Sequence, residues 1–314
     1  MTLAFTFPGQ GSQFVGMGQA LSEAFPAARA TFREVDDALG QNLSKLMWGG
    51  PEESLTLTAN TQPALMVCGL AAMAALKTEF DVEITHAKYA AGHSLGEYTA
   101  LCAAGSLTLA DTARLLRIRG DAMQAAVPVG KGAMAALLGA SVEDAEAAAK
   151  VGAAKGICQL ANDNATGQVV LSGEKAAVEA ACEAAREMGV KKAVMLSVSA
   201  PFHCDMMSPA ADAMREALAD VDFKSPSVPI VNNVQARAIT DPDQLRADLV
   251  AQVTGRVRWR ESVEWMHGNG IERFAEPGCG KVLTGMARRI VRELKGSALN
   301  TPEGLENFAK ELKG

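Results

Sequence analysis

The motif G-H-S-L-G at residues 92–96 constrains the fold more than any other segment, because it follows an apolar run at 89–91 and precedes a helical pattern that extends to residue 104. A serine between two such glycines, at a strand-to-helix turn, is typical of the nucleophile elbow of α/β enzymes. The glycines permit a sharp, strained turn that directs the serine oxygen into a cleft. We therefore predict that Ser94 is a nucleophile and that the backbone N–H of Leu95 faces the oxyanion. In the alternative interpretation, the motif is a chance match and Ser94 only caps a helix.

The same order of strand, tight turn and helix occurs at residues 3–25 and again from residue 271 onward, where we expect a helix to begin at Lys281. Strands that alternate with helices indicate a mainly parallel sheet that is covered on both faces. The sequence therefore predicts an α/β fold with a large α/β-hydrolase-like domain.

Residues 128–197 have a different order of elements. We expect strands at 133–138, 157–161, 168–172 and 193–198, helices at 142–151 and 175–188, and a polar loop at 162–167. This βαββαβ order is typical of ferredoxin-like domains. We therefore expect residues 1–127 and 198–314 to form the large catalytic domain and residues 128–197 to form a small inserted ferredoxin-like domain. The active site should lie where the two meet, because domain interfaces commonly form ligand clefts.

Charge and cysteine content exclude several classes of protein. The 314-residue chain has a formal net charge of -6, which argues against a general nucleic-acid binder. Its six cysteines are scattered without metal-ligand spacing, as is typical of reduced cytosolic thiols. The N-terminus lacks a basic signal-peptide region, and the longest weakly polar stretch, residues 63–76, is shorter than the roughly 20 residues of a membrane-spanning helix. We therefore expect a cytoplasmic protein with no membrane segment.

Two glycine-rich segments resemble phosphate-binding loops but lack required residues. Phe14 replaces the third glycine of a dinucleotide fingerprint that would begin at Gly9. In the segment that ends at Lys281, Ala275 replaces the first glycine of a P-loop and Val282 replaces its Ser or Thr. We therefore expect neither a cofactor nor a metal.

A serine nucleophile needs a base, which is usually histidine, and the chain contains four histidines. His86 lies in a polar loop, and His267 lies near the end of an expected helix. His93 lies within the elbow, and we expect it to point away from the serine. His203 remains, in a loop just after a predicted strand end, where α/β enzymes place catalytic groups. No acidic residue stands out as the partner that would orient His203.

Arg119 is the second informative residue, because it shares one face of a predicted helix with Leu116 and Met123. An arginine on an apolar face needs an anionic partner, and a planar guanidinium is well suited to a carboxylate. We therefore predict that Arg119 binds a substrate carboxylate. An internal ion pair or a snorkelling side chain is the alternative. Arg114 and Arg117 fall on other faces and should be solvated.

Taken together, the motifs of this chain resemble those of the malonyl-CoA:acyl carrier protein transacylase family, in the family's order and over nearly the whole chain. The motifs are F-P-G-Q-G-S-Q at 7–13, G-H-S-L-G-E at 92–97, R-G-x-x-M at 119–123, N-x-x-G-Q-V-V at 164–170, S-A-P-F-H at 199–203 and G-K-V-L-T-G at 280–285. The resemblance implies ping-pong transfer of a malonyl group from coenzyme A to the phosphopantetheine thiol of acyl carrier protein, through a malonyl ester on Ser94, in fatty acid synthesis.

The resemblance also implies the roles of five residues in this reaction. Ser94 would be the nucleophile and His203 the general base. The backbone N–H groups of Gln10 and Leu95 would form the oxyanion hole. Arg119 would hold the malonyl carboxylate.

Four further residues are assigned on the same basis. Gln252 matches the family residue whose carbonyl orients the catalytic histidine, and Met123 and Asn164 fall within family motifs and are assigned to substrate binding. Phe202 is also assigned to substrate binding, although a small residue is often found at this position in stand-alone bacterial members. A bulky side chain beside the base should disfavour an α-methyl branch on the substrate.

Malonyl-CoA and an acidic, phosphopantetheinylated acyl carrier protein are the partners that the resemblance implies, and we expect the enzyme to be a monomer. Because the chain is itself acidic, a carrier would need a local basic docking surface. The candidates are Lys281, Arg288, Arg289, Arg292 and Lys295 on the last long helix, or Lys191 and Lys192 in the small domain. Solvated helix faces are the alternative explanation for these side chains.

Three other functions fit part of the sequence. A serine hydrolase, such as a lipase or thioesterase, is equally compatible with the elbow, but a neutral ester has no carboxylate for Arg119. A non-catalytic protein that binds acyl carriers is disfavoured by the intact Ser94, His203 and Arg119. An acyltransferase domain cut from a polyketide synthase is disfavoured by the clean start and end of the chain.

Overall fold

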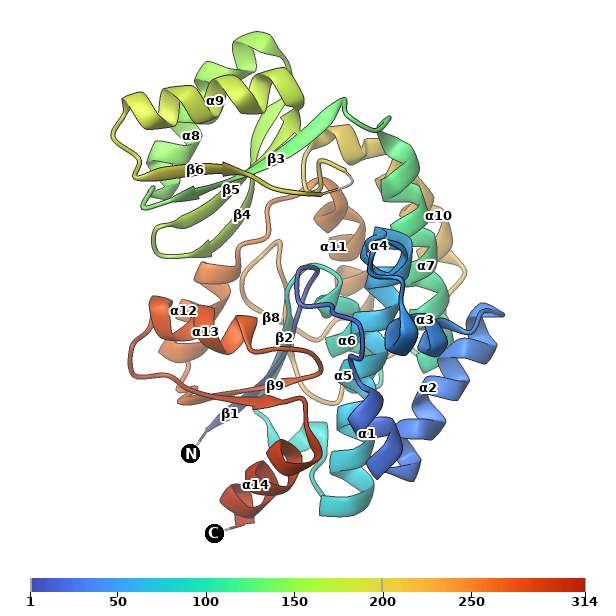
Figure 1. Ribbon diagram of the computed structural model, residues 1–314. Helices are drawn as coiled ribbons and strands as arrows, with labels where there is room; N and C mark the ends of the chain where they lie inside the picture. The colour runs from blue at the N-terminus through green and yellow to red at the C-terminus, as the bar shows by residue number, and fades with distance from the viewer. Residues whose placement is uncertain (1, 199, 314) are drawn as a thin grey trace.

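The computed structural model describes residues 2–198 and 200–313, so Ser199, the first residue of the S-A-P-F-H motif, lies outside the described residues. The structure has two β-sheets, the smaller one at the top of Figure 1 and the larger one below it, surrounded by helices. The larger sheet has the order β10-β9-β1-β2-β7-β8, in which β8 is antiparallel to β7 and the other neighbours are parallel. Its strands are β1 Leu3–Phe7, β2 Tyr89–Gly92, β7 Ile230–Val231, β8 Ala238–Ile239, β9 Arg273–Pro277 and β10 Lys295–Leu299. The prediction of a mainly parallel sheet is confirmed.

Helices cover both faces of this sheet. The helices outside residues 128–197 are α1 Gln19–Ala24, α2 Pro26–Leu39, α3 Leu43–Gly49, α4 Glu52–Thr56, α5 Thr58–Phe80, α6 Gly96–Ala103, α7 Leu109–Ala126, α10 Ser208–Ala219, α11 Pro242–Thr254, α12 Trp259–Gly268, α13 Val282–Ile290 and α14 Pro302–Lys313, with short 3-10 turns at Ile84–His86 and Asp205–Met207. Phe5 of β1 and Ala90 of β2 belong to a core that includes residues of α5 and α7, whereas Ala4 and Ala91 belong to a core that includes residues of α12 and α13. Adjacent strand residues thus face opposite layers, as the two-residue period of a strand requires.

The smaller sheet is antiparallel, has the order β4-β5-β3-β6, and carries two helices (Figure 1). Its elements are β3 Gly132–Leu138, α8 Val142–Gly152, a 3-10 turn Ala153–Lys155, β4 Cys158–Ala165, β5 Gln168–Glu174, α9 Lys175–Glu187 and β6 Lys192–Met195. The predicted polar loop at 162–167 is wrong, because residues 162–165 complete β4 and only Thr166 and Gly167 form the turn. Two irregularities in the pairing of β4 with β5 interrupt the alternation that would have indicated a strand.

Two further expectations about helices need correction. The basic residues near the C-terminus do not share one helix, because α13 ends at Ile290, Arg292 lies beyond it, and Lys295 begins β10. The apolar stretch at 63–76 is part of a longer helix, α5, which has 23 residues and is long and apolar enough to cross a membrane. However, 72% of its most apolar window is buried inside the fold, as in the core helix of a globular protein.

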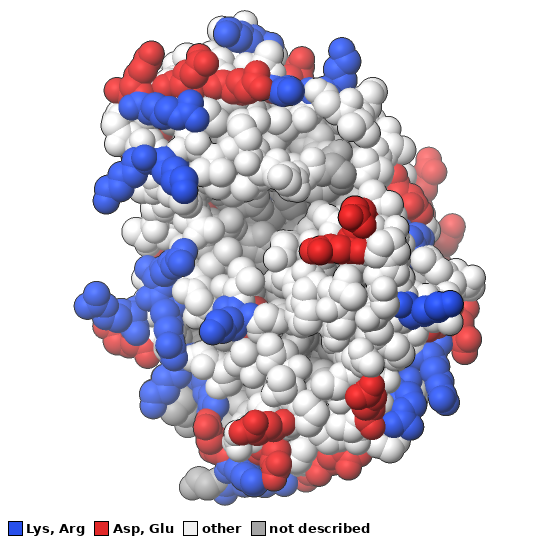
Figure 2. Space-filling model, in the orientation of Figure 1, with Lys and Arg blue, Asp and Glu red and all other residues white. Residues whose placement is uncertain are grey.

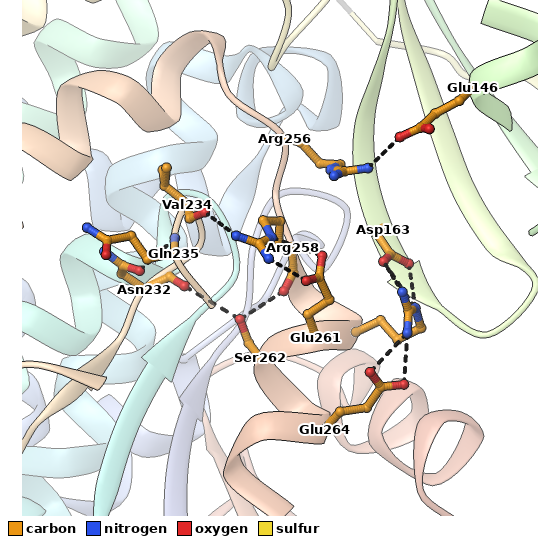
Figure 3. A network of polar contacts seen from close by, with 11 residues as sticks. Glu146, Asp163, Asn232, Val234, Gln235, Arg256, Arg258, Glu261, Ser262 and Glu264 are labelled. Atoms are coloured by element: carbon orange, nitrogen blue, oxygen red, sulfur yellow. Dashed lines mark hydrogen bonds and ion pairs between the residues drawn. The ribbon is translucent and has the colours of Figure 1, made fainter. Parts of the chain in front are cut away.

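Strand β4 joins the smaller sheet to the rest of the molecule. The backbone N–H of Asp163 donates to Val257 O at 2.9 Å, and the N–H of Val257 donates to Ala161 O at 2.8 Å. The side chain of Asp163 is only 1% exposed, and Arg260 of α12 donates to both of its carboxylate oxygens, at 3.0 and 3.1 Å through Nε (Figure 3). A strand bridge and a buried ion pair therefore hold the two parts together at adjacent positions.

We predict that Arg260→Met lowers the free energy of unfolding by about 2 kcal/mol, because it leaves the buried carboxylate of Asp163 without its charged partner. Arg256→Met is the matched control. Arg256 pairs with Glu146 at 3.1 Å, but these side chains are 32% and 58% exposed, and exposed pairs contribute about 0–1 kcal/mol. Urea unfolding of both variants measures the difference, and an equal loss in both would contradict the importance of the buried pair.

Candidate functional site

The elbow between β2 and α6 has the predicted sharp turn. Ser94 adopts a left-handed backbone conformation with φ 53°, which is costly for any residue with a side chain. A Cβ atom at Gly92 would lie 1.9 Å from the backbone of Gly96, and a Cβ atom at Gly96 would lie 2.2 Å from the carbonyl oxygen of Phe7. Only glycine therefore fits on either side of the turn. The backbone is further fixed because the N–H of Ser94 donates to Asn233 Oδ1 at 2.7 Å.

His203 lies beside the serine hydroxyl, with 2.8 Å between its Nε2 and Ser94 Oγ. Its Nδ1 lies 2.9 Å from the carbonyl oxygen of Gln252. A carbonyl oxygen only accepts, so Nδ1 must carry the proton and Nε2 of the neutral ring is free to accept one from Ser94. His203 also adopts a left-handed conformation, with φ 58°. The imidazole is thus oriented by an uncharged backbone group, which explains why no acidic partner stood out in the sequence.

Burial, and after it the positive charge of Arg119, lowers the pKa of His203 to about 3. The imidazole is 4% exposed. At neutral pH it is therefore in the uncharged form that can accept a proton.

Arg119 is buried, with 1% of its surface exposed, and lies on the same side of α7 as the buried Leu116 and Met123, as the helical spacing predicts. Its Nη2 donates to Ser94 Oγ at 3.1 Å and to Gln252 Oε1 at 2.9 Å. Its Nη1 donates to Gln62 Oε1 at 2.7 Å. The guanidinium therefore touches the serine oxygen directly and is held from two other helices.

The other two arginines of this helix differ from each other. Arg114 is exposed, as expected, and pairs with Asp111. Arg117 is only half-buried and donates to Asn60 Oδ1 at 2.8 Å and to Gln41 Oε1 at 2.6 Å. The expectation that Arg117 is simply solvated is therefore wrong, because it links α7 to α5 and to the turn before α3.

A cavity of about 330 Å³ opens above the elbow, between the two sheets. Ser94, His203 and Arg119 line it, together with the other predicted site residues except Gln252, namely Gln10, Leu95, Met123, Asn164 and Phe202. Gln252 lies behind the cavity and is completely buried. In the described part of the chain, neither Gln10 nor Leu95 donates its backbone N–H to another backbone group in a turn or loop. Figure 2 shows this hollow, with basic side chains on the side of α12 and α13 and acidic side chains on the side of α4.

His93 and Asn164 connect the elbow to the smaller sheet. His93 Nε2 lies 2.8 Å from Asn164 Oδ1, and both residues line the cavity. The ring of His93 contacts Asn164 and Trp259, so a histidine that is expected to point away from the serine still lines the site. Asn164 belongs to β4 and not to a loop, so a strand brings it to the elbow.

Three polar residues at the site were not predicted from the sequence. Gln62 of α5 and Glu97 of α6 are completely buried in helices that are otherwise largely apolar, and Asn233 is buried just after β7. A polar residue within an apolar helix is a signal that could have identified the first two, because buried polar groups need partners. Among the described residues, no cluster of three or more His, Cys, Asp or Glu side chains could hold a metal ion.

Comparisons with known proteins identify the family of this chain. The model of the family described as "Acyl transferase domain" matches residues 4–272. The malonyl CoA-acyl carrier protein transacylase of Bacillus subtilis (strain 168) is 44% identical over 312 residues, which cover 99% of this chain and 97% of that protein. The crystal structure of an acyl-carrier-protein-S-malonyltransferase from Bartonella henselae is 52% identical and has a TM-score of 0.97, with 100% of both chains covered. A malonyl-transacylase in complex with its type II PKS acyl-carrier protein is 41% identical, with a TM-score of 0.95, and the match covers 99% of this chain and 100% of that one. The resemblance inferred from the motifs is confirmed.

We predict that the imidazole of His203 does not titrate between pH 5 and pH 8 in the folded protein. Because its folded-state pKa lies below the unfolded value of about 6.5, its contribution to stability is complete above that value and is lost as the pH falls toward 3. NMR of the ring Cε1–H as a function of pH measures this, and the protein unfolded in urea serves as the reference. Arg119→Met should move the pKa upward, and a pKa that is unchanged in this variant would contradict the role of the arginine charge.

Proposed function

The chain belongs to the acyl transferase domain family, and we propose that it transfers a malonyl group from coenzyme A to the phosphopantetheine thiol of acyl carrier protein, through an ester on Ser94, for fatty acid synthesis. The single observation that carries this proposal is the buried guanidinium of Arg119, 3.1 Å from Ser94 Oγ. A cation at this position suits an acyl group that ends in a carboxylate, whereas a neutral acyl group would leave the charge unpaired. The names of the relatives support the same donor and acceptor.

In the first half-reaction, His203 Nε2 accepts the hydroxyl proton while Ser94 Oγ attacks the thioester carbonyl carbon. The backbone N–H groups of Gln10 and Leu95 stabilise the oxyanion. The carbon–sulfur bond then breaks, and the coenzyme A sulfur leaves with the proton from His203. In the second half-reaction, the carrier's thiol gives its proton to His203 and attacks the ester carbon. The bond between this carbon and Ser94 Oγ then breaks, and Oγ takes the proton back from His203, so both residues are restored.

Gln252 supports this cycle without adding charge to the base. Its carbonyl oxygen accepts the Nδ1 proton of His203, which fixes the tautomer with Nε2 toward the serine. A carboxylate in this position would stabilise the imidazolium more strongly. A carbonyl keeps the histidine a weaker base, which suits a reaction in which a thiol leaves in the first half-reaction and another thiol attacks in the second.

Arg119, Met123, Asn164 and Phe202 would bind the substrate. Arg119 would hold the malonyl carboxylate and keep the ester where water approaches badly, which favours transfer over hydrolysis. Phe202 lines the cavity next to the base, and its bulk would disfavour an α-methyl branch, although one methyl group changes the discrimination by only about 1–3 kcal/mol. Asn164, which is hydrogen-bonded to His93, is positioned to contact the phosphopantetheine arm of the substrate.

We further propose that residues 128–197 form a small ferredoxin-like domain within a large α/β-hydrolase-like domain of residues 1–127 and 198–314. The strand order β4-β5-β3-β6 and a separate cluster of buried apolar residues on α8, α9 and this sheet support the division. We propose that the enzyme acts in the cytoplasm, where malonyl-CoA and reduced thiols would be available.

A serine hydrolase remains the second candidate, because the elbow and the Ser94–His203 pair alone would support it equally. The contact of Arg119 with Ser94 Oγ favours the transferase, since a hydrolase of neutral esters gains nothing from a buried cation beside its nucleophile.

Mass spectrometry tests the acyl-enzyme. We expect incubation with malonyl-CoA to add a malonyl group to the peptide that contains Ser94, and we expect no adduct in Ser94→Ala and little with acetyl-CoA. Arg119→Ala should lose transfer by at least about 100-fold and hydrolyse a larger share of what it forms, because the carboxylate is no longer held. Release of coenzyme A without any adduct would identify a hydrolase. No adduct and no release would identify a non-catalytic binder.

We propose that the carrier docks on the basic side chains of α13, which lines the cavity. Arg289 reaches Gln168 of β5 at 2.9 Å and so lies between the two sheets, and Lys281 precedes the helix. Charge reversal at Lys281 and Arg289 should lower kcat/KM for the carrier by about tenfold, with formation of the malonyl adduct unchanged. Lys310→Glu on α14, at the far end of the molecule, is the control (Figure 1). Equal effects in the control, or an effect that does not weaken in high salt, would argue against this docking face.

A further inference from the structure

Glu97 is a buried carboxylate directly behind the nucleophile. It lies in the first turn of α6 and is completely buried. Its Oε2 accepts from the backbone N–H of Asn233 at 2.9 Å and from Nε2 of Gln252 at 2.9 Å. Its Oε1 has no hydrogen-bond partner among the described residues. Glu97 therefore satisfies only part of its hydrogen-bonding capacity, although it is fully removed from water.

The side-chain amide of Gln252 lies between Glu97 and Arg119. Its Nε2 donates to Glu97 and, at 3.1 Å, to the carbonyl oxygen of Ser94, while its Oε1 accepts from Arg119 at 2.9 Å. The amide cannot rotate without placing its NH₂ group against the guanidinium and its oxygen against the carboxylate. The amide of Gln252 thus links the carboxylate of Glu97 to the guanidinium of Arg119, although these two groups are not in direct contact.

Arg119 has no carboxylate in direct contact. None of the ion pairs in residues 2–198 and 200–313 includes it, and the described acceptors around it, Gln62, Ser94 and Gln252, are neutral. An isolated buried cation is strongly unfavourable. Glu97, linked through Gln252, is placed to supply the opposite charge.

We propose that Glu97 is a positioning residue that balances the charge of Arg119 while the site is empty, and that it thereby weakens the hold of Arg119 on the malonyl carboxylate. This inference rests on the proposed function. When the substrate carboxylate arrives, two anions share one guanidinium, and their repulsion opposes binding. A weaker hold suits a ping-pong enzyme, because an acyl group bound too tightly in the ester intermediate would be slow to leave on the carrier.

The charged and titratable groups around Glu97 make its protonation sensitive to substrate binding. Arg119 of α7 attracts its charge, Asp248 of α11 repels it, and Tyr98 of α6 is its neighbour in sequence. Asp248 is itself satisfied, with hydrogen bonds from Asn232, Gln235 and Gln244. Burial raises the pKa of Glu97 to about 7. A second anion at Arg119 would raise this pKa further, so substrate binding near pH 7.5 should be accompanied by uptake of a proton by Glu97.

Calorimetric titration of malonyl-CoA into Ser94→Ala, in which acylation is blocked, tests the inference. Glu97→Gln in this background has nearly the same shape but no charge, and we expect it to bind malonyl-CoA on the order of tenfold more tightly. The gain should vanish when Arg119 is also changed to Met. Acetyl-CoA, which lacks the carboxylate, should bind Ser94→Ala with and without Glu97→Gln equally well.

Two matched variants separate charge from packing. Glu97→Asp keeps the charge and should not tighten binding. Glu276→Gln removes the charge of another buried glutamate, which accepts from the backbone N–H groups of Leu283 and Thr284 at the start of α13, and it should not tighten binding either.

Proton uptake provides a readout that a purely structural role would not affect. Titration at pH 7.5 in buffers of different ionisation enthalpy should reveal uptake of a fraction of a proton when Glu97 is present and none in Glu97→Gln, in both cases with Ser94→Ala. This measurement still tests the inference if Glu97→Gln fails to fold, because uptake in Ser94→Ala should be absent when acetyl-CoA, which lacks the carboxylate, replaces malonyl-CoA. Unchanged or weaker binding in folded Glu97→Gln, or no uptake with Glu97 present, would overturn the inference and leave the proposed function intact. Malonyl-CoA binding that does not depend on Arg119 would overturn both.

Discussion

The contact between a buried guanidinium and a serine oxygen governs the arrangement of the site. Arg119 enters the interior on α7, and a buried cation requires acceptors that leave its charge available. Gln62 and Gln252 provide neutral oxygens from α5 and α11, so the positive charge is oriented without being neutralised by direct contact. Three helices that are far apart in sequence must therefore converge behind the elbow. The large parallel sheet, covered on both faces, is the framework that brings them together.

Backbone strain is present at both residues that are proposed to exchange a proton, although Asp81 and Ala236, outside the site, also have a positive φ. Ser94 and His203 both have left-handed backbone conformations, which cost of order 1–3 kcal/mol each. Closely packed neighbours fix these two left-handed conformations. Gly92 and Gly96 pack backbone against backbone, and the carbonyl of Gln252 fixes the histidine ring. The rest of the core stabilises these conformations, and in return Oγ and Nε2 stay within hydrogen-bond distance before any substrate binds.

The sequence predicted the parallel sheet, the elbow and the positions of Ser94, His203 and Arg119, because each depends on local spacing or on a motif. It did not predict that Asn164 lies in a strand, because the irregular pairing of β4 with β5 removes the two-residue period on which such a prediction depends. It also did not predict a role for Glu97, which entered the sequence analysis only as the last residue of the motif at 92–97. The contacts of Glu97 come from Gln252 of α11 and from Asn233, two residues beyond β7, and pairings at such separations leave no local pattern.

In the empty site, one cation affects the two titratable groups in opposite directions. Arg119 favours the charged form of Glu97 and disfavours the charged form of His203. The histidine therefore remains an acceptor, and the glutamate retains part of its charge in spite of burial. A substrate carboxylate at Arg119 would reduce both effects together, so the basicity of His203 would rise when the acyl group is in place. The base would then be strongest when a thioester is present to react, and weakest when only water could use it.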